Sequence, residues 1–190
     1  MKKREGEDRL ITLPNILSFV RILMIPFIIL SFLQREYLLG AVFVILSGLT
    51  DLLDGYAARR FGDITKIGKM LDPVADKLTQ VAILIGLVIY FPLAAITLVI
   101  FVLKEFTMAL YNLYFMYKGH EYEGAIIYGK VSTMVFYISM IIIFLIKGMS
   151  TTLSVFLLIL TTSFLLISWI GHMIEYTNQY KEYKRKLYSF

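Results

Sequence analysis

The stretch LTDLLDGYAARRFGDITKIGKMLDPVADKL, residues 49–78, carries four of its five acidic side chains in two helical pairs. Asp51 and Asp54 are three residues apart, and Asp72 and Asp76 are four apart, so each pair lies on one face of a helix. A short basic loop joins the two helices. Because the loop is short, we expect the helix ends to lie close together and the four carboxylates to converge on one pocket.

Outward from this stretch the chain is mostly apolar. Of its 190 residues, 58% are hydrophobic and 17% charged, against about 45–50% and 25% in soluble domains. A membrane-spanning helix takes about 20 apolar residues. Six apolar segments can be delimited: Ile16–Leu33, Tyr37–Ala58, Leu78–Tyr90, Leu93–Phe115, Ile127–Ile146 and Thr151–Tyr176. The composition excludes a soluble, disordered or disulfide-built chain, and it predicts an all-α integral membrane protein with six transmembrane helices in one domain, residues 1–190.

The third apolar segment, Leu78–Tyr90, is short for a membrane span. It becomes long enough if its helix begins near Lys69 or Asp72. The first turn of that helix would then be polar and would protrude from the lipid. The prediction therefore places the acidic residues of this helix at the membrane surface.

Basic residues predict the orientation of the chain. With a cytoplasmic N-terminus, the inner segments hold thirteen basic residues and the outer turns hold two, Arg35 and Lys147. This asymmetry follows the positive-inside rule, so six spans put both termini and the acidic pocket on the cytoplasmic side of a cell membrane. The net charge of +5 then reflects orientation and contact with anionic headgroups, and no nucleic-acid partner is expected.

Four carboxylates in one pocket repel each other, and the repulsion grows as the dielectric falls. Divalent cations would relieve it. The chain has no Cys and two His, so the ligands would be oxygen atoms, which suit Mg²⁺, Mn²⁺ or Ca²⁺. Two such ions that share carboxylates form a clamp for displacement at phosphorus. The alternatives are helix caps and a cation or proton pathway, although these acids cluster at one face and form no chain across the membrane.

Small residues between the acidic pairs would let a ligand approach the backbone. They are Gly55, Ala58 and Gly68. Arg59 stands beside them and suits the recognition of phosphate oxygens. The pattern therefore favours a phosphate-containing substrate.

These residues resemble the signature of the CDP-alcohol phosphotransferase family, D-x2-D-G-x2-A-R-x8-G-x3-D-x3-D. The eight fixed positions here are Asp51, Asp54, Gly55, Ala58, Arg59, Gly68, Asp72 and Asp76. The resemblance implies a dinuclear site with two divalent cations, Mg²⁺ or Mn²⁺. It implies further that an acceptor hydroxyl attacks the β-phosphorus of a CDP-linked donor and expels CMP.

The resemblance also implies a role for each fixed position. Asp51, Asp54 and Asp72 would bind metal, and Asp76 would both bind metal and act as the general base. The CDP moiety would be held by Gly55, Ala58 and Arg59, with Gly68 giving it room. Members of the family are often homodimers.

Two further stretches narrow the resemblance. LPNILSFVRILMIP, residues 13–26, and GKMLDPVADKL, residues 68–78, are similar to phosphatidylglycerophosphate synthases and related cardiolipin synthases. This likeness implies CDP-diacylglycerol as the donor, with its lipid tail in the bilayer. Glycerol 3-phosphate is the acceptor that it favours.

The downstream sequence departs from that group. Its R-E-F segment is Lys104-Glu105-Phe106 here, and the second Arg, eight residues later, is Asn112. Its G-K-x-K-T element keeps one lysine, Lys130. An acceptor phosphate needs cationic donors, and Lys104, Lys130 and Arg21 are the candidates. Lys104 could instead pair with Glu105 or with a pocket acid.

Because this chain lacks basic residues that the related synthases carry, other acceptors remain alternatives to glycerol 3-phosphate. Phosphatidylglycerol, as in cardiolipin synthesis, needs less phosphate anchoring, and inositol phosphate and serine are further options. A divalent-cation transporter is the alternative from another functional class.

For residues outside the signature, we expect ordinary structural roles. His120 and His172 are predicted to be ordinary surface residues. Four aromatic residues, namely Trp169, Tyr176, Tyr180 and Tyr183, are predicted to form an interfacial belt. The closing segment KEYKRKLYSF, residues 181–190, is predicted to contact lipid headgroups.

Overall fold

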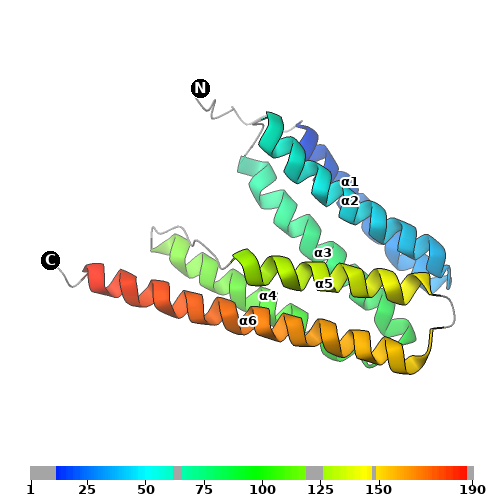
Figure 1. The fold of residues 1–190 in the computed structure, drawn as a ribbon. Helices are drawn as coiled ribbons and strands as arrows, with labels where there is room; N and C mark the ends of the chain where they lie inside the picture. The colour runs from blue at the N-terminus through cyan, green and yellow to red at the C-terminus, as the bar shows by residue number, and fades with distance from the viewer. Residues whose placement is uncertain (1–11, 62–65, 119–125, 147–148, 188–190) are drawn as a thin grey trace. The chain divides into compact units, whose positions relative to one another are not determined.

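The computed structural model describes residues 12–61, 66–118, 126–146 and 149–187, and these residues form α-helices without any strand (Figure 1). The helices in chain order are α1 (Leu13–Leu33), α2 (Tyr37–Phe61), α3 (Lys66–Tyr90), α4 (Ala94–Tyr117), α5 (Ile126–Leu145) and α6 (Thr151–Leu187). The prediction of an all-α chain is confirmed for this part of the sequence.

Five of the helices are long and apolar enough to cross a membrane, namely α1, α3, α4, α5 and α6. In α2 the apolar stretch among the described residues is the shorter Leu38–Thr50. The protein is therefore a multi-pass membrane protein, whereas the sixth span and the side of the termini stay predictions. Helix α3 begins at Lys66, so the third segment does reach spanning length through a polar first turn.

The chain packs as two compact units. Unit 1 comprises α1, α2, α3 and the segment Met140–Gly148, which includes the end of α5. Unit 2 comprises most of α4, the first part of α5 and α6. The single domain expected from the sequence stays a prediction.

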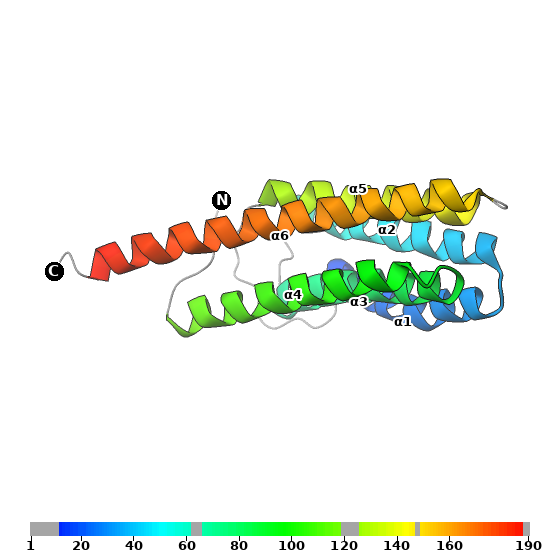
Figure 2. The same cartoon turned by 90° about the horizontal axis from the view of Figure 1, so that it is seen from below.

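Unit 1 is built on α1, which packs against both α2 and α3 (Figure 2). Its core centres on Phe32, whose ring stacks on Phe144 with centroids 4.4 Å apart. A methyl group at Gly40 or Gly86 would overlap the Phe32 ring, so only glycine fits at these two positions. The Tyr90 hydroxyl donates to the Phe32 carbonyl. These contacts join α1, α2 and α3 around one aromatic side chain.

The ends of α1 are defined by local hydrogen bonds. Thr12 caps the start, since its Oγ1 accepts from the Asn15 N–H at 3.4 Å. At the other end, Arg35 takes a left-handed φ of 61°, and the Glu36 N–H donates to the Ser31 carbonyl at 2.9 Å. This tight turn reverses the chain into α2.

Unit 2 is built on α6, which packs against α4 and α5. The Thr97 and Thr162 hydroxyls, on α4 and α6, are 2.7 Å apart. A Cβ atom at Gly171 would lie 3.0 Å from the Tyr128 ring of α5, so the absence of a side chain lets α5 and α6 approach closely. Phe101 and Phe136 fill the core between α4 and α5, with centroids 6.3 Å apart.

One expected surface residue in α6, His172, is buried, so that prediction is wrong, and Tyr176 of the expected interfacial belt is buried as well. The His172 ring is buried, and its Nδ1 lies 2.7 Å from the Ser168 carbonyl one turn earlier. Tyr176 is 1% exposed, and its hydroxyl donates to Asn112 Oδ1 at 3.0 Å. Neighbouring helices cover both side chains, which the spacing along α6 alone did not reveal. His120 and the side chain of Tyr183 lie outside the described residues.

Candidate functional site

Two carboxylates of the acidic stretch lie one turn apart at the start of α3. Asp72 and Asp76 both belong to this helix, as their spacing predicts. Their side chains are 47% and 17% exposed, respectively. Both carboxylates can therefore meet a ligand that approaches the polar first half of α3.

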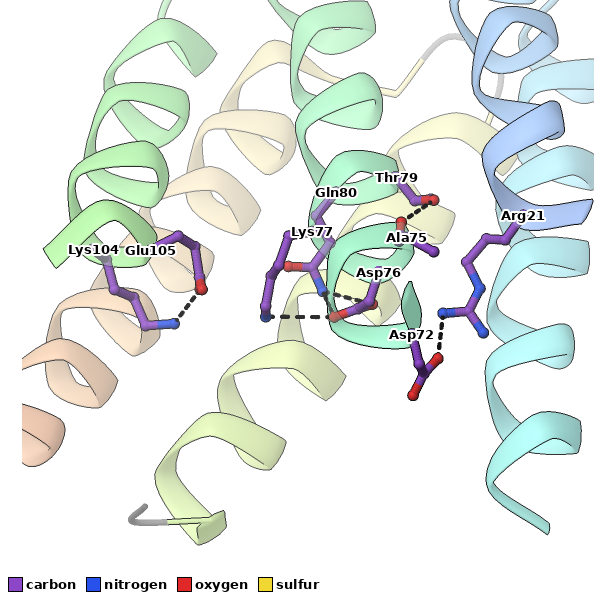
Figure 3. A network of polar contacts seen from close by, with 9 residues as sticks. All are labelled: Arg21, Asp72, Ala75, Asp76, Lys77, Thr79, Gln80, Lys104 and Glu105. Carbon is purple, nitrogen blue, oxygen red and sulfur yellow. Dashed lines mark hydrogen bonds and ion pairs between the residues drawn. The ribbon is translucent and has the colours of Figure 1, made fainter. Parts of the chain in front are cut away.

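Asp72 is held by a cation from another helix (Figure 3). Arg21 of α1 places Nη1 3.4 Å from Asp72 Oδ1, and its own side chain is fully buried. A buried guanidinium is costly without a counter-charge, so this ion pair compensates Arg21 while it holds Asp72. The carboxylate stays half exposed, and the pair thus ties α1 to α3 without closing off Asp72.

Asp76 is held from within its own helix. The Gln80 side-chain amide donates to both carboxylate oxygens, with Nε2 3.2 Å from Oδ1 and 3.3 Å from Oδ2. Gln80 is buried at 2% exposure, whereas the Lys77 ammonium, 3.4 Å from Oδ2, is about one-third exposed. A buried amide one turn away restricts the rotation of the carboxylate. Asp76 is therefore oriented before any substrate arrives.

The other half of the signature lies on α2. Asp51, Asp54, Gly55 and Ala58 fall within this helix, as predicted, and Arg59 does so too, although the predicted segment ends at Ala58. The side chains of these five residues lie outside the described residues. Only residues 62–65 separate α2 from α3, so the facing ends of the two helices are within about 19 Å of each other. The convergence of the four carboxylates stays a prediction.

Gly68 lies in the first turn of α3, one turn before Asp72, and is half-buried. Its position on the same helix as the two carboxylates agrees with the predicted place for a ligand. The contact that it would make with the donor stays a prediction.

The described donors fit a hard divalent cation by their chemistry. Asp72 and Asp76 offer oxygen ligands that remain reachable, and the chain has no Cys to favour a softer metal. Within the described ranges, no three acidic, His or Cys side chains gather into a cluster. Asp51 and Asp54 would have to complete the ligand set from α2.

The two lysines proposed for acceptor binding differ in their surroundings. Lys104 of α4 is buried, and its Nζ lies 2.7 Å from Glu105 Oε1, so it takes the first of its two expected partners (Figure 3). Lys130 of α5 is exposed. Whether either lysine binds an acceptor stays a prediction.

Three partners of the carboxylates were not predicted from the sequence. Gln80 follows Asp76 by four residues, a spacing that brings side chains together on a helix, so this contact could have been foreseen. Lys77 is adjacent to Asp76 in the sequence. The pair of Arg21 with Asp72 spans 51 positions, and no local spacing indicates it.

Comparison with known proteins connects these features to one family. The family model described as CDP-alcohol phosphatidyltransferase matches residues 11–170, which is most of the chain. This range includes α1 to α5, all eight signature positions and most of α6.

Individual relatives carry two kinds of name. A Rickettsia felis protein named CDP-diacylglycerol–glycerol-3-phosphate 3-phosphatidyltransferase is 49% identical over 80 residues, 40% of this chain and 41% of that protein. An Aquifex aeolicus protein of the same name is 27% identical over 168 residues, 85% of this chain and 94% of that protein. A Streptomyces coelicolor cardiolipin synthase (CMP-forming) is 40% identical over 92 residues, 44% and 42% of the two chains. The match to the Rickettsia relatives thus spans about two-fifths of their length.

Proposed function

This chain belongs to the CDP-alcohol phosphatidyltransferase family, and from that premise we propose that it transfers a phosphatidyl group from CDP-diacylglycerol to an alcohol. The acceptor that we propose is glycerol 3-phosphate, which gives phosphatidylglycerophosphate and CMP. The protein would thus be a phospholipid-synthesising enzyme.

The observation that carries this proposal is the arrangement on α3. Two signature carboxylates lie one turn apart, each still reachable and each held by a buried partner, Arg21 or Gln80. A solvated structural turn would not require two buried polar side chains to orient its acids. Relatives named for the glycerol 3-phosphate reaction support the choice of acceptor.

Two divalent cations, Mg²⁺ or Mn²⁺, would be held by Asp51, Asp54, Asp72 and Asp76, and they would neutralise the pyrophosphate and stabilise the departing CMP. The CDP moiety would lie against Gly55, Ala58 and Arg59, with Gly68 leaving room for it. Arg59 would supply a planar, bidentate donor to phosphate oxygens.

Asp76 would act as the general base. The acceptor hydroxyl oxygen attacks the β-phosphorus, its proton passes to an Asp76 carboxylate oxygen, and a new phosphorus–oxygen bond forms. The pyrophosphate bond to CMP breaks, and CMP leaves with the electron pair. Gln80, bonded to both oxygens of Asp76, would keep the carboxylate turned toward the hydroxyl.

The membrane arrangement that we propose has six spans and both termini in the cytoplasm of the cell. Five helices long enough to cross a membrane support it, and α2 would be the remaining span. The excess of basic residues in the segments on the N-terminal side supports this orientation. The active site would then face the cytoplasm, where a water-soluble acceptor is present.

A second candidate reaction is cardiolipin synthesis with phosphatidylglycerol as the acceptor. It is favoured by two observations on α4: the Lys104 ammonium is already paired with Glu105, and Asn112 accepts a hydrogen bond from Tyr176. Neither residue offers an uncompensated cation to an acceptor phosphate. A relative named cardiolipin synthase is consistent with this reading.

The test is CMP release by the purified full-length protein with CDP-diacylglycerol and Mg²⁺ or Mn²⁺. Parallel reactions contain glycerol 3-phosphate, phosphatidylglycerol, inositol phosphate or serine. We expect the fastest release with glycerol 3-phosphate, and a preference for phosphatidylglycerol would replace the first reaction by the second. No release with any acceptor, together with metal flux in proteoliposomes, would overturn the enzyme in favour of a cation transporter.

A further inference from the structure

A groove of about 490 Å³ lies between α4 and α6, wholly within unit 2. Aromatic side chains make up most of its lining. From α4 these are Tyr111, Tyr114 and Phe115, and from α6 they are Tyr176 and Tyr180. The groove does not involve the acidic signature, and the proposed reaction makes no use of it.

The floor of the groove is preorganised. Tyr176 and Phe115 are buried, and the Tyr176 ring stacks on Tyr111 with centroids 4.7 Å apart. The Tyr176 hydroxyl is held by Asn112 Oδ1 at 3.0 Å, which fixes the ring across the space between the helices. Tyr111 and Leu110 remain exposed at one end, so an apolar chain can lie along this floor.

The other end of the groove is cationic. Tyr114 and Tyr180 approach each other with centroids 6.2 Å apart. The Lys118 ammonium lies 6.0 Å from the Tyr114 centroid, and the Lys184 ammonium lies 5.2 Å from the Tyr180 centroid. Both lysines are exposed. Two positive charges thus flank the same pair of rings, where each ammonium is attracted to a ring face and still reaches the solvent.

The length of α6 places this end at headgroup depth. The helix has 37 residues and is about 56 Å long, against about 30 Å for the hydrocarbon core. About 20 residues cross that core, and Tyr176 and Tyr180 follow more than 20 residues of helix. Tyrosine rings and lysines at this depth meet phosphate groups, while Leu110 extends toward the acyl chains.

We propose that this groove binds an anionic phospholipid, with an acyl chain along Tyr111 and Leu110 and the headgroup between Lys118 and Lys184. Charge selects the ligand, because the two ammonium groups gain most from a headgroup whose phosphate is not balanced by its own cation. A zwitterionic lipid brings such a cation and is disfavoured.

The experiment uses the full-length protein in phosphatidylcholine vesicles that contain a trace of photoactivatable phosphatidylglycerol with a diazirine on one acyl chain. Photoactivatable phosphatidylcholine is the matched probe. After irradiation, mass spectrometry maps the label on peptides of α4 and α6. We expect labelling around Leu110–Phe115 from the anionic probe and little from the zwitterionic one.

The decisive variant is Lys118→Gln combined with Lys184→Gln, which removes both charges and keeps polar side chains of similar length. Loss of two charges near an anionic ligand predicts affinity about 30-fold lower, read as labelling at subsaturating probe. Arg35→Gln, in the turn between α1 and α2, is the control and should label as the wild type does. Equal labelling by both probes, or labelling unchanged in the double variant, would overturn the proposal.

A second copy of the chain is the competing occupant of the groove. The chain has no Cys, so Tyr114→Cys introduces a single reactive site on the groove wall. Efficient disulfide or bifunctional cross-linking between two chains through this position would overturn the lipid proposal. CMP release, measured on the same samples, reports on the proposed reaction separately, because neither lysine belongs to the site on α3.

Discussion

The ion pairs on α3 and α4 resemble each other in composition and differ in what they leave available. On α4, Lys104 and Glu105 are neighbours in the sequence, pair at 2.7 Å, and are mostly buried together. On α3, Asp72 is paired at 3.4 Å with Arg21, a residue of another helix. The first pair is short and local, and the second is longer and joins two elements.

The difference shows how a membrane protein can hold a charged side chain in place and still leave it accessible to a ligand. Lys104 and Glu105 compensate each other and present little charge to a ligand. Asp72 keeps 47% of its side chain exposed although its partner is fully buried. The desolvation penalty of the pair therefore arises mainly at Arg21. A carboxylate held in this way can bind a ligand without first breaking a tight pair. The following variants test this comparison.

Asp76→Asn should have the largest effect, because it removes the proposed proton acceptor and keeps the size of the side chain. We expect CMP release to fall by about 10²–10⁴-fold, the usual contribution of general acid–base catalysis. Single-turnover CMP release is the measurement. Glu175→Gln is the matched control, since Glu175 also accepts from a glutamine four residues later, Gln179, at 3.2 Å. Undiminished turnover in Asp76→Asn would remove this residue from the base role.

Asp72→Asn should break the pair between α1 and α3. It removes this counter-charge from the fully buried Arg21, and we expect the free energy of unfolding to fall by about 3 kcal/mol, the low end for a broken buried pair because Asp72 itself is half exposed. Denaturant unfolding in detergent micelles measures this change. Lys130→Met, which removes an exposed cation from α5, is the control and should change stability little. Equal stability of the two variants would contradict the role of Asp72 as a counter-charge of Arg21.

Gln80→Leu should loosen the orientation of Asp76 without removing the carboxylate. Partners of this kind typically change metal affinity or activity by about 10–100-fold, and we expect a loss in that range for Mn²⁺. Mn²⁺ binding followed by electron paramagnetic resonance gives a readout independent of turnover. Gln179→Leu on α6 removes the same type of amide from Glu175 and should leave Mn²⁺ binding unchanged.

The double substitution Lys104→Met and Glu105→Leu should have the smallest effect. Replacing both members of a buried pair by apolar residues avoids an uncompensated charge, so we expect stability within about 1 kcal/mol of the wild type. Each single substitution should cost more than the double one. A double variant less stable than both single variants would show that the pair on α4 stabilises the fold beyond compensating its own two charges.

Local spacing accounts for a large part of what could be predicted. The apolar segments predicted the helices, and the third helix was expected to begin near Lys69 or Asp72, three to six residues after its observed start at Lys66. The i, i+4 spacing of Asp72 and Asp76 predicted their common helix. Helix geometry is short-range, so residues within one turn of each other can be placed from sequence alone.

Contacts between residues that are far apart in the sequence could not be predicted from local spacing. His172 was expected at the surface and is buried, and Tyr176 of the expected interfacial belt is buried too, because residues of other helices cover them. Asn112, which marked a departure from the family pattern, is the hydrogen-bond partner of Tyr176, 64 positions away. Side-chain burial depends on which helices pack together, and periodicity within one helix does not determine that.

The amino-acid sequence by itself determined the helical membrane class, the acidic signature and the family resemblance, because these depend on composition and on spacing within a few turns. Only the tertiary structure decided that Arg21 pairs with Asp72 and that α4 and α6 enclose an aromatic groove. Both features join segments far apart in the chain, and their energies arise from burial and charge pairing that exist only once the helices have packed.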